Sequence, residues 1–334
     1  MTSLVTGAGG FLGQYIVEQL VTRGDSVRAL ARRETPALQA LGVECMRGDV
    51  RELADMKRAC RDVEVVYHAA AVAGLWGSWR HYYDANVMGT KNVISGCCHA
   101  GVTRLVFTSS PSVTFAGRDQ CGVDESAPYP TCWLAHYPHT KALAEQLVLQ
   151  ANGEHHLLTC ALRPHLIWGP RDHHLIPRLL DRARKGQLRQ VGNGQNMIDA
   201  VYVENAAAAH LLAADALRPG APVCGKAYFI TNGEPVNCWQ WINQVLVLGG
   251  VPPVQKQISL RAAYLAGTAL EALWTILCRT DEPRMTRFLA AQLGTSHYFD
   301  IAAARQDLGY VPRVSMAEGM RRLAASLSPA SKNG

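Results

Sequence analysis

A tyrosine and a lysine four residues apart form the pair in this sequence best suited to proton transfer. On a helix, Tyr137 and Lys141 would share one face and lie within reach of each other. A tyrosine titrates at about 10 in water, and an ammonium group nearby lowers that pKa by about 1–3, which suits an acid or base. Ser110, at the end of an expected strand, could hold a carbonyl oxygen against the phenol. These residues predict proton transfer to or from a carbonyl or alcohol group.

Three glycines separate a short apolar run from a segment with helical spacing. Without side chains, Gly7, Gly10 and Gly13 would let the backbone approach a pyrophosphate at the N-terminus of the helix. The flanking strand and helix favour this interpretation over a glycine-rich turn without a ligand. The loop therefore predicts a dinucleotide-binding site.

Two arginines follow the second expected strand. Folds that prefer NAD place an acid at the end of that strand, whereas this sequence has Ala31 there, followed by Arg32 and Arg33. Guanidinium groups would bind a 2′-phosphate through paired, charged hydrogen bonds. NADP(H) is therefore favoured, and NAD(H) with both arginines in solvent is the alternative.

Alternating strands and helices must position these residues. We expect strands at 3–6, 26–31, 63–70, 104–109 and 158–163, and helices at 11–23, 86–100 and 137–151. This alternation implies parallel pairing through right-handed crossovers, and it predicts an α/β fold with a Rossmann-type, doubly wound parallel sheet. Pro138 is compatible with a helical Tyr137 only if the helix begins there.

The alternation loosens after Arg163, where prolines and glycines interrupt the chain. Segments 199–217 and 226–231 could return to the sheet. We therefore expect an NADP(H)-binding domain at 1–165 plus about 197–233, and a smaller, mostly helical C-terminal substrate lobe at 166–196 plus 234–328. Residues 329–334 are expected to form a tail.

The composition is that of a globular protein with a sizeable core, because the 334 residues are 48% hydrophobic and 18% charged. The net charge of +6 comes from scattered basic residues, which argues against a nucleic-acid partner. The ten cysteines have no Cys-x-x-Cys spacing, and the glycine loop follows the start of the sequence directly. We therefore expect no leader, no metal site, mostly buried reduced thiols and a cytoplasmic protein.

Four stretches together resemble an extended short-chain dehydrogenase: residues 6–13, Ser109-Ser110, Tyr137-Pro-His-Thr-Lys141, and Leu162-Arg-Pro164 with Gly169-Pro170. Segments 105–113 and 162–172 resemble the 3β-hydroxysteroid dehydrogenase branch. Within this branch, segments 73–78, 85–87 and 225–235 are more similar to the 2-alkyl-3-oxoalkanoate reductases of bacterial olefin biosynthesis than to sterol-4α-carboxylate 3-dehydrogenases.

The resemblance implies an oxidoreductase in which Tyr137 is the acid or base, Lys141 contacts the tyrosine and the nicotinamide ribose, and Ser110 orients the substrate. Asp49 resembles the acid that contacts adenine. A homodimer packed on the helices that contain Asn86 and Tyr137 is expected for the family. The implied cofactor-binding residues are Gly7, Gly10, Phe11, Leu12, Gly13, Arg32, Arg33, Asp49, Val50, Ala69, Ala70, Tyr137, Lys141 and Pro164.

The substrate implied by the resemblance is a hydrophobic 3-oxo or 3-hydroxy acid, whose carboxylate lies one carbon from the reacting centre. The leading interpretation is reduction of a 2-alkyl-3-oxoalkanoate with NADPH, and a 3β-hydroxysteroid or decarboxylating sterol dehydrogenase is the alternative. Arg171 and His165 could anchor the carboxylate, although this basic loop could equally be solvated or bind cofactor phosphate. Trp76 is a further candidate substrate contact.

Two other functions are weaker. A sugar-nucleotide epimerase shares the Tyr137 and Lys141 pair but should prefer an acid at Ala31. A non-catalytic NADP(H) sensor would need the glycine loop but not Tyr137, Lys141 or Ser110.

The segment from Ala262 to Cys278 is almost wholly apolar, with Glu271 as its only charge. At about 1.5 Å per residue it would span about 25 Å, less than the roughly 30 Å core of a bilayer. We expect a hydrophobic lid or an interfacial helix that touches a membrane or a partner enzyme. Core or dimer packing is the alternative.

Overall fold

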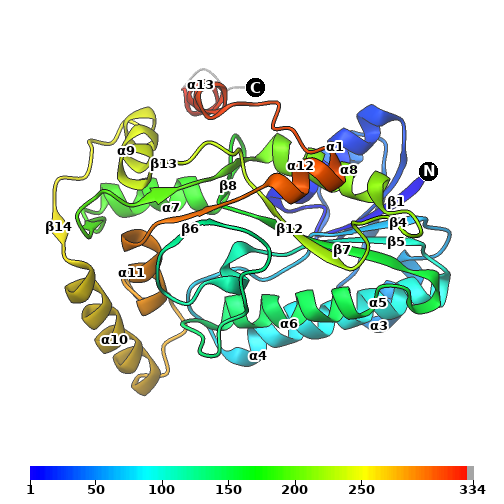
Figure 1. Cartoon of the computed structure of the whole chain (residues 1–334), viewed down its shortest axis with the longest axis horizontal. Coiled ribbons are helices and arrows are strands. Elements are labelled where there is room, and N and C mark those ends of the chain that lie inside the picture. Colours follow the sequence, from blue (N-terminus) through cyan, green and yellow to red (C-terminus); the bar gives the residue numbers. More distant parts are fainter. Residues whose placement is uncertain (329–334) are drawn as a thin grey trace.

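The computed structural model describes residues 1–328, and a seven-stranded parallel sheet lies at its centre (Figure 1). The strand order is β12-β7-β5-β4-β1-β2-β3, which reverses direction between β1 and β4. This arrangement confirms the predicted doubly wound sheet, and the crevice at the reversal is where such folds bind ligands. The strands are β1 (Thr2–Thr6), β2 (Ser26–Ala31), β3 (Glu44–Arg47), β4 (Val65–His68), β5 (Arg104–Thr108), β7 (Leu158–Pro164) and β12 (Lys226–Ile230).

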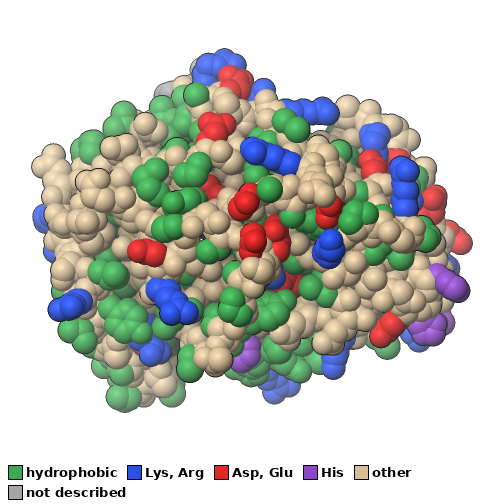
Figure 2. Space-filling view, in the orientation of Figure 1, with side chains coloured by type: hydrophobic (Ala, Val, Ile, Leu, Met, Phe, Trp, Pro, Cys, Tyr) green, Lys and Arg blue, Asp and Glu red, His purple; other side chains and the backbone are tan. Residues whose placement is uncertain are grey.

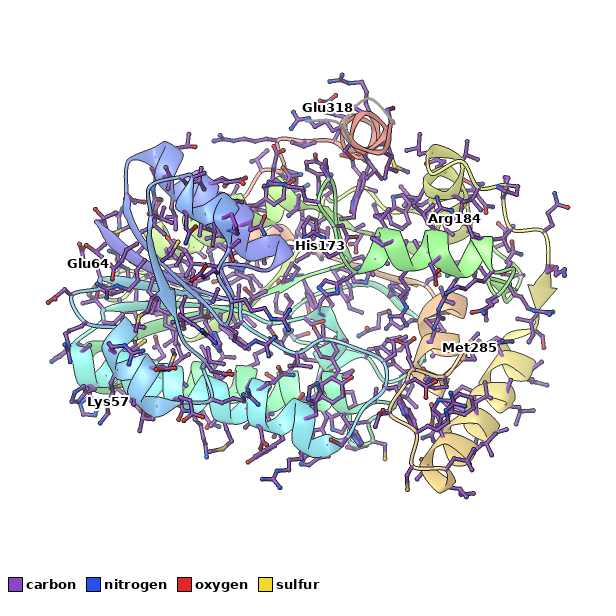
Figure 3. The ribbon with its side chains drawn as sticks, turned by 180° about the vertical axis from the view of Figure 1, so that it is seen from behind. Lys57, Glu64, His173, Arg184, Met285 and Glu318 are labelled. Atoms are coloured by element: carbon purple, nitrogen blue, oxygen red, sulfur yellow. The ribbon has the colours of Figure 1, made fainter. Side chains whose placement is uncertain are left out.

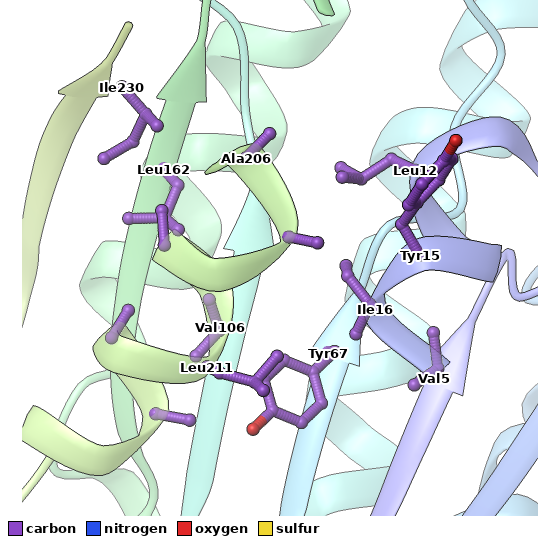
Figure 4. Packing of buried hydrophobic residues seen from close by; sticks show 14 of the residues in the cluster. Val5, Leu12, Tyr15, Ile16, Tyr67, Val106, Leu162, Ala206, Leu211 and Ile230 are labelled. Atoms are coloured by element: carbon purple, nitrogen blue, oxygen red, sulfur yellow. The ribbon is translucent and has the colours of Figure 1, made fainter. Parts of the chain in front are cut away.

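Helices cover both faces of this sheet (Figure 1). One face carries α1 (Phe11–Arg23), α8 (Val203–Ala216) and α12 (Ala302–Leu308), and the other carries α3 (Leu53–Ala59), α5 (Gly89–Ala100) and α6 (His136–Gln150). The alanines of α8 let this helix lie close to α1 and the strands, where Ala206, Ile16 and Val106 pack in one buried cluster (Figure 4). Segment 199–217 therefore returns to the sheet as a covering helix. Short elements α2 (Pro36–Gln39), η2 (Pro111–Thr114) and η3 (Glu154–His156) lie in the connections.

The helix expected at 86–100 starts earlier and has a wide turn. Helix α4 (Trp79–Tyr82) continues into a π-helical turn, η1 (Tyr83–Met88), and then into α5. Within this turn the Asn86 amide bonds to the backbone of Val72 at 2.8 and 3.0 Å and to the Thr140 hydroxyl at 3.1 Å. The turn thereby ties the 69–78 loop to α6.

The start of α6 resolves the question of Pro138. The helix begins at His136 after Ala135, so Pro138 lies in the first turn, where its missing N–H has no intrahelical role. Tyr137 is therefore helical, as the spacing to Lys141 requires.

The remaining chain forms a mostly helical second part with three small sheets. Its helices are α7 (Leu175–Arg184), α9 (Cys238–Leu248), α10 (Leu260–Ile276), α11 (Arg287–Gly294) and α13 (Met316–Leu327). The small sheets pair β8 (Ile167–Trp168) with β11 (Val201–Tyr202), pair β9 (Gln190–Val191) with β14 (Gln257–Ile258), and join β13 (Val236–Asn237), β10 (Met197–Ile198), β15 (His297–Phe299) and β6 (Gln120–Val123). Because β6 precedes α6 in sequence, the last of these sheets crosses the expected domain division. The tail expected at 329–334 lies outside the described residues.

The structure corrects the expectation that the cysteines are mostly buried. Cys60, Cys97, Cys160 and Cys238 are buried, but four others are exposed, and none of the ten is in a disulfide. The exposed four lie in short strands, loops or helix ends rather than in the sheet core: Cys45, Cys121, Cys132 and Cys278. Among residues 1–328, no helix combines the length and apolarity needed to cross a bilayer.

Candidate active site

The glycine loop is packed too closely to accept side chains. A Cβ atom on Gly7 would lie 2.7 Å from the backbone of Ala70, and one on Gly13 would lie 2.2 Å from the carbonyl oxygen of Gly7. Gly7 also has a left-handed φ of +69°. The loop thus brings bare backbone to the N-terminus of α1, beside the end of β4, and this cradle fits the pyrophosphate of a dinucleotide.

Beside the loop lies a nucleotide cavity of about 460 Å³. Its Asp49 pairs with Arg51 at 2.7 Å, and the hydrogen bond from that guanidinium holds the pKa of the Asp49 carboxyl below its usual value. Eight of the residues expected to bind the cofactor line it together: Gly7, Gly10, Arg32, Arg33, Asp49, Val50, Ala69 and Ala70.

A second cavity of about 430 Å³, the catalytic cavity, adjoins the first, because Gly7, Gly10 and Ala69 line both. It gathers the proposed catalytic residues, the rest of the expected cofactor residues and one candidate substrate residue, His165: the others are Phe11, Leu12, Gly13, Ser110, Tyr137, Lys141 and Pro164. Residues from α1 and α6 and from the ends of β5 and β7 therefore meet at one place, at the carboxyl edge of the sheet.

The environment of Tyr137 differs from the expectation. Burial raises the pKa of the phenol, and a hydrogen bond with Ser110 acts in the opposite sense without cancelling it. Lys141 is not among the groups that act on Tyr137, so the predicted ammonium-stabilised phenolate is wrong for this arrangement. A buried phenol stays protonated at neutral pH, which suits it to donate a proton.

Lys141 is almost fully buried, with 2% of its side chain surface exposed. Burial lowers its pKa to about 7, and the Glu145 carboxylate opposes this shift. Its Nζ lies 4.0 Å from the centre of the Phe107 ring, where the ring face favours the cation. The amine can therefore change its protonation near neutral pH.

Ser110 lies two residues beyond the end of β5 with an extended backbone (φ −158°, ψ 144°), lines the catalytic cavity and hydrogen-bonds with the Tyr137 phenol. The hydroxyl shares a 2.8 Å hydrogen bond with Ser112. This serine can thus orient an oxygen held at Tyr137.

His165 belongs to a buried hydrogen-bonded chain in the wall of the catalytic cavity. Its Nδ1 lies 2.7 Å from the Asp199 carboxylate, and its Nε2 lies 3.1 Å from Nδ1 of His297. His297 in turn donates from Nε2 to the carbonyl oxygen of Gln292 at 2.8 Å. Both ring nitrogens of His165 are engaged within the protein, so the residue shapes the wall through these contacts.

The third cavity, of about 1140 Å³, is the largest of the three, and Tyr137 lines it as well as the catalytic cavity. We call it the large cavity. Trp76 lines it and donates from its indole N–H to the carbonyl oxygen of Arg279 at 3.1 Å. Helix α10 forms one wall with Thr268, Glu271, Ala272 and Thr275, which follow one another at helical spacing.

The outer face of α10 is exposed and apolar. Leu265 and Leu273, which do not line the cavity, are 68% and 45% exposed. Hydrophobic side chains gather where α10 lies, at the lower left of Figure 2. The segment is therefore a cavity wall whose outer face is open, and Glu271 on its inner face is buried.

Arg171 is placed elsewhere, which corrects its expected role as a carboxylate anchor. Its guanidinium bonds to the Glu18 carboxylate at 2.5 and 2.8 Å and lies over the Tyr15 ring, 4.1 Å from the centre. The loop that carries Arg171 and His173 runs beside α1 (Figure 3), and Arg171 lines none of the three cavities. Its charge is neutralised on α1.

Several lining residues were missed at the sequence level. Trp133 and Tyr82 in the large cavity lie in loops or short helices without a recognisable motif. Arg287 and Phe288 begin α11, and His297 lies in a strand of three residues. Only the apolar run that became α10 gave a signal.

Comparison with known proteins gives close relatives over the whole length. The chain is 50% identical over 329 residues to a 2-alkyl-3-oxoalkanoate reductase of Stenotrophomonas maltophilia, covering 98% of this chain and 99% of that protein. It is 47% identical over 332 residues to the reductase of the same name from Shewanella oneidensis, covering 97% and 86%. A decarboxylating sterol-4-alpha-carboxylate 3-dehydrogenase of Mus musculus is 36% identical over 326 residues, covering 96% and 90%.

Solved structures show the same fold. The crystal structure of gox2253 superposes with a TM-score of 0.79 at 26% identity, covering 97% of both chains. MoeE5 in complex with UDP-glucose and NAD gives a TM-score of 0.73 at 27% identity, covering 98% of both. Residues 4–260 match the 3-beta hydroxysteroid dehydrogenase/isomerase family. The chain therefore belongs to this family and is a nicotinamide-dinucleotide-dependent oxidoreductase of the extended short-chain dehydrogenase type.

Proposed function

We propose that this protein reduces the 3-oxo group of a 2-alkyl-3-oxoalkanoate to the 3-hydroxy acid with NADPH. The observation that carries the proposal is the position of Tyr137, which lines both the catalytic cavity and the large cavity. A carbonyl at Tyr137 would have the cofactor site on one side and room for alkyl chains on the other. The names of the two bacterial relatives support the same substrate class.

In this proposal the bound dinucleotide supplies the hydride that the carbonyl carbon accepts. Tyr137 donates its phenolic proton to the carbonyl oxygen, so the ketone gains one hydride and one proton and becomes an alcohol. Ser110 donates a hydrogen bond that holds this oxygen at the phenol. The raised pKa of Tyr137 supports the role of acid, and Lys141, whose pKa lies near neutrality, lines the same cavity.

The preference for NADPH is supported by Arg32 and Arg33. Both line the nucleotide cavity next to Gly9 and Thr35. Neither guanidinium has an ion-pair partner within residues 1–328, so both have donors available for a 2′-phosphate.

A dehydrogenase for a 3β-hydroxysteroid or sterol carboxylate is the second candidate, supported by the 1140 Å³ size of the large cavity and the 36% identity to the Mus musculus enzyme. Offering NADP⁺ with a 2-alkyl-3-hydroxyalkanoic acid, and separately with a 3β-hydroxysteroid, tests both by the appearance of NADPH. We expect faster turnover of the alkyl acid. Faster turnover of the steroid would reverse the order, and turnover of neither would reject both functions.

We further propose that the outer face of α10 contacts a membrane surface. Its exposed leucine side chains support this role, since such side chains lie in the headgroup region when helices of this kind bind. Co-sedimentation with phospholipid vesicles should fall when Leu265 and Leu273 are both changed to Ser. Equal sedimentation of the variant and the wild type would argue against the contact.

A further inference from the structure

We propose that Arg287 binds the carboxylate of the β-oxo or β-hydroxy acid substrate, an inference that rests on the proposed function. The proposed 2-alkyl-3-oxoalkanoate and the alternative sterol carboxylate both carry a carboxylate one carbon from the reacting centre. Arg171 is turned away on α1, so a different cation must meet this group if the protein recognises it.

Arg287 lies where two cavities adjoin. It lines the large cavity together with Tyr137, and the next residue, Phe288, lines the catalytic cavity with Ser110 and Lys141. Phe288 is fixed against Phe115, with ring centres 5.9 Å apart in an edge-to-face arrangement. A group held by Arg287 would therefore enter from the same side of Tyr137 as the bulk of the large cavity.

The position of Arg287 is fixed by α10. The Glu271 carboxylate, 9% exposed, accepts from Nε of Arg287 at 2.6 Å and from its backbone N–H at 2.7 Å. One turn earlier on α10, a Cβ atom at Gly267 would lie 2.6 Å from the carbonyl carbon of Thr286. Helix α10 and the start of α11 are thus in backbone contact, and in the rear view the loop carrying Met285 joins them (Figure 3).

The guanidinium still has free donors. Both oxygens of Glu271 are used on Nε and the backbone, and neither Nη1 nor Nη2 of Arg287 has a partner in the described chain. The side chain is 40% exposed and contributes to the cavity wall. Two terminal N–H groups in one plane are suited to bind a second carboxylate.

The other cations of the large and catalytic cavities are already engaged. Lys141 is bonded to a backbone carbonyl beneath the catalytic cavity. Arg279 donates from Nε and Nη2 to Asp281, both at 2.7 Å, and lies over the Trp274 ring. His165 uses both ring nitrogens on Asp199 and His297. Within residues 1–328, Arg287 is the arginine of these two cavities whose terminal nitrogens, Nη1 and Nη2, are both without a partner, whereas Nη2 of Arg279 is bonded to Asp281.

The experiment compares an acid with its ester. We would measure the kcat and KM of the wild type and of Arg287→Gln for a 2-alkyl-3-hydroxyalkanoic acid and for its methyl ester, with NADP⁺. We expect the variant to raise KM for the acid about tenfold or more, because charged hydrogen bonds are lost, and to leave KM for the ester within about threefold. Arg287→Lys should recover part of the affinity for the acid. Arg261→Gln, which removes an exposed charge outside the cavities on the neighbouring helix α10, should leave the kcat and KM for both substrates unchanged.

Because Arg287→Gln leaves the Glu271 carboxylate without its partner, the double variant with Glu271→Gln provides a folded comparison, checked by its urea midpoint. An equal loss on acid and ester in both variants, or an unchanged KM for the acid, would overturn the inference. Failure of the proposed function has a different signature, since the wild type would then turn over neither the acid nor the ester.

Discussion

The Nζ atom of Lys141 donates a hydrogen bond to the carbonyl oxygen of Thr108, 2.5 Å away. This contact ties α6 to the last residue of β5, directly before Ser109 and Ser110. This contact therefore holds the helix of Tyr137 and Lys141 against the strand that leads to Ser110. In place of water, the buried ammonium contacts one carbonyl oxygen and the face of the Phe107 ring.

Burial of Lys141 predicts a pH-dependent stability. The folded pKa is about 7, whereas an unfolded lysine titrates at about 10.4. Between these values only the unfolded chain binds the proton, so the stability of the wild type rises with pH. The wild type should gain about 1–3 kcal/mol of unfolding free energy from this lysine between pH 7 and pH 9, and Lys141→Met should lack this gain.

Urea unfolding of both proteins at pH 7, 8 and 9 measures this difference, in which other titrating groups cancel. A stability difference that stays constant with pH would contradict a depressed lysine pKa.

Removal of the phenolic hydroxyl should stop turnover without affecting the cofactor. Tyr137→Phe keeps the buried ring but deletes the proton donor, and we expect kcat to fall about 10²–10⁴-fold. The Kd for NADPH, from fluorescence titration, should stay within about twofold. Tyr83→Phe is a matched control, because the Tyr83 ring packs on Trp79 rather than on the catalytic cavity. Activity of Tyr137→Phe within a few-fold of the wild type would remove Tyr137 from the mechanism.

A methyl group at Gly13 should abolish dinucleotide binding. The added Cβ would overlap the carbonyl oxygen of Gly7, so Gly13→Ala must move α1 or the loop, at a cost of about 1–3 kcal/mol of stability. For comparison, Gly42→Ala has open space around the new Cβ and suffers only from its φ of +70°, so its binding should be unaffected. Calorimetric titration with NADPH and urea midpoints measure both effects. Normal NADPH binding by Gly13→Ala would show that the loop is not the site.

A charge reversal beside the nucleotide cavity should change the cofactor preference. In Arg32→Asp the carboxylate would repel a 2′-phosphate and accept from a ribose hydroxyl, so kcat/KM should fall about tenfold or more for NADPH and be kept for NADH. Arg61→Asp makes the same charge change at an exposed position outside the cavities and should affect neither cofactor. Intact NADPH use by Arg32→Asp would refute the assignment.

Local sequence patterns predicted the part of the site that depends on local structure. The helix at 11–23 and the strand at 26–31 have the bounds expected, because Gly10 precedes the helix and the left-handed Gly24 ends it before the strand begins. The spacing of four residues on α6 fixes Tyr137 relative to Lys141, and the end of β5 places Ser110 beside them. Motifs of this kind are short and act over a few residues.

The rest of the site depends on distant pairing. Arg171 and Glu18 are separated by 153 positions, and His297 and His165 by 132, so no local spacing links them. The spacing of Tyr137 and Lys141 correctly placed them on one helix, but their pKa values follow from how deeply the surrounding chain buries them. Arg287 has no motif, and its role follows only from where Gly267 allows α10 to lie.

Strand β15, which pairs with β6, forms part of the wall of the catalytic cavity and is synthesised late in translation. A nascent chain synthesised as far as β12 already contains every strand of the seven-stranded sheet and the whole glycine loop. It still lacks Arg287, Phe288 and His297, the last of which lies about nine-tenths of the way along 334 residues. Translation order therefore separates the two halves of the site in time: the chain acquires its place for the nucleotide before it acquires its place for the substrate.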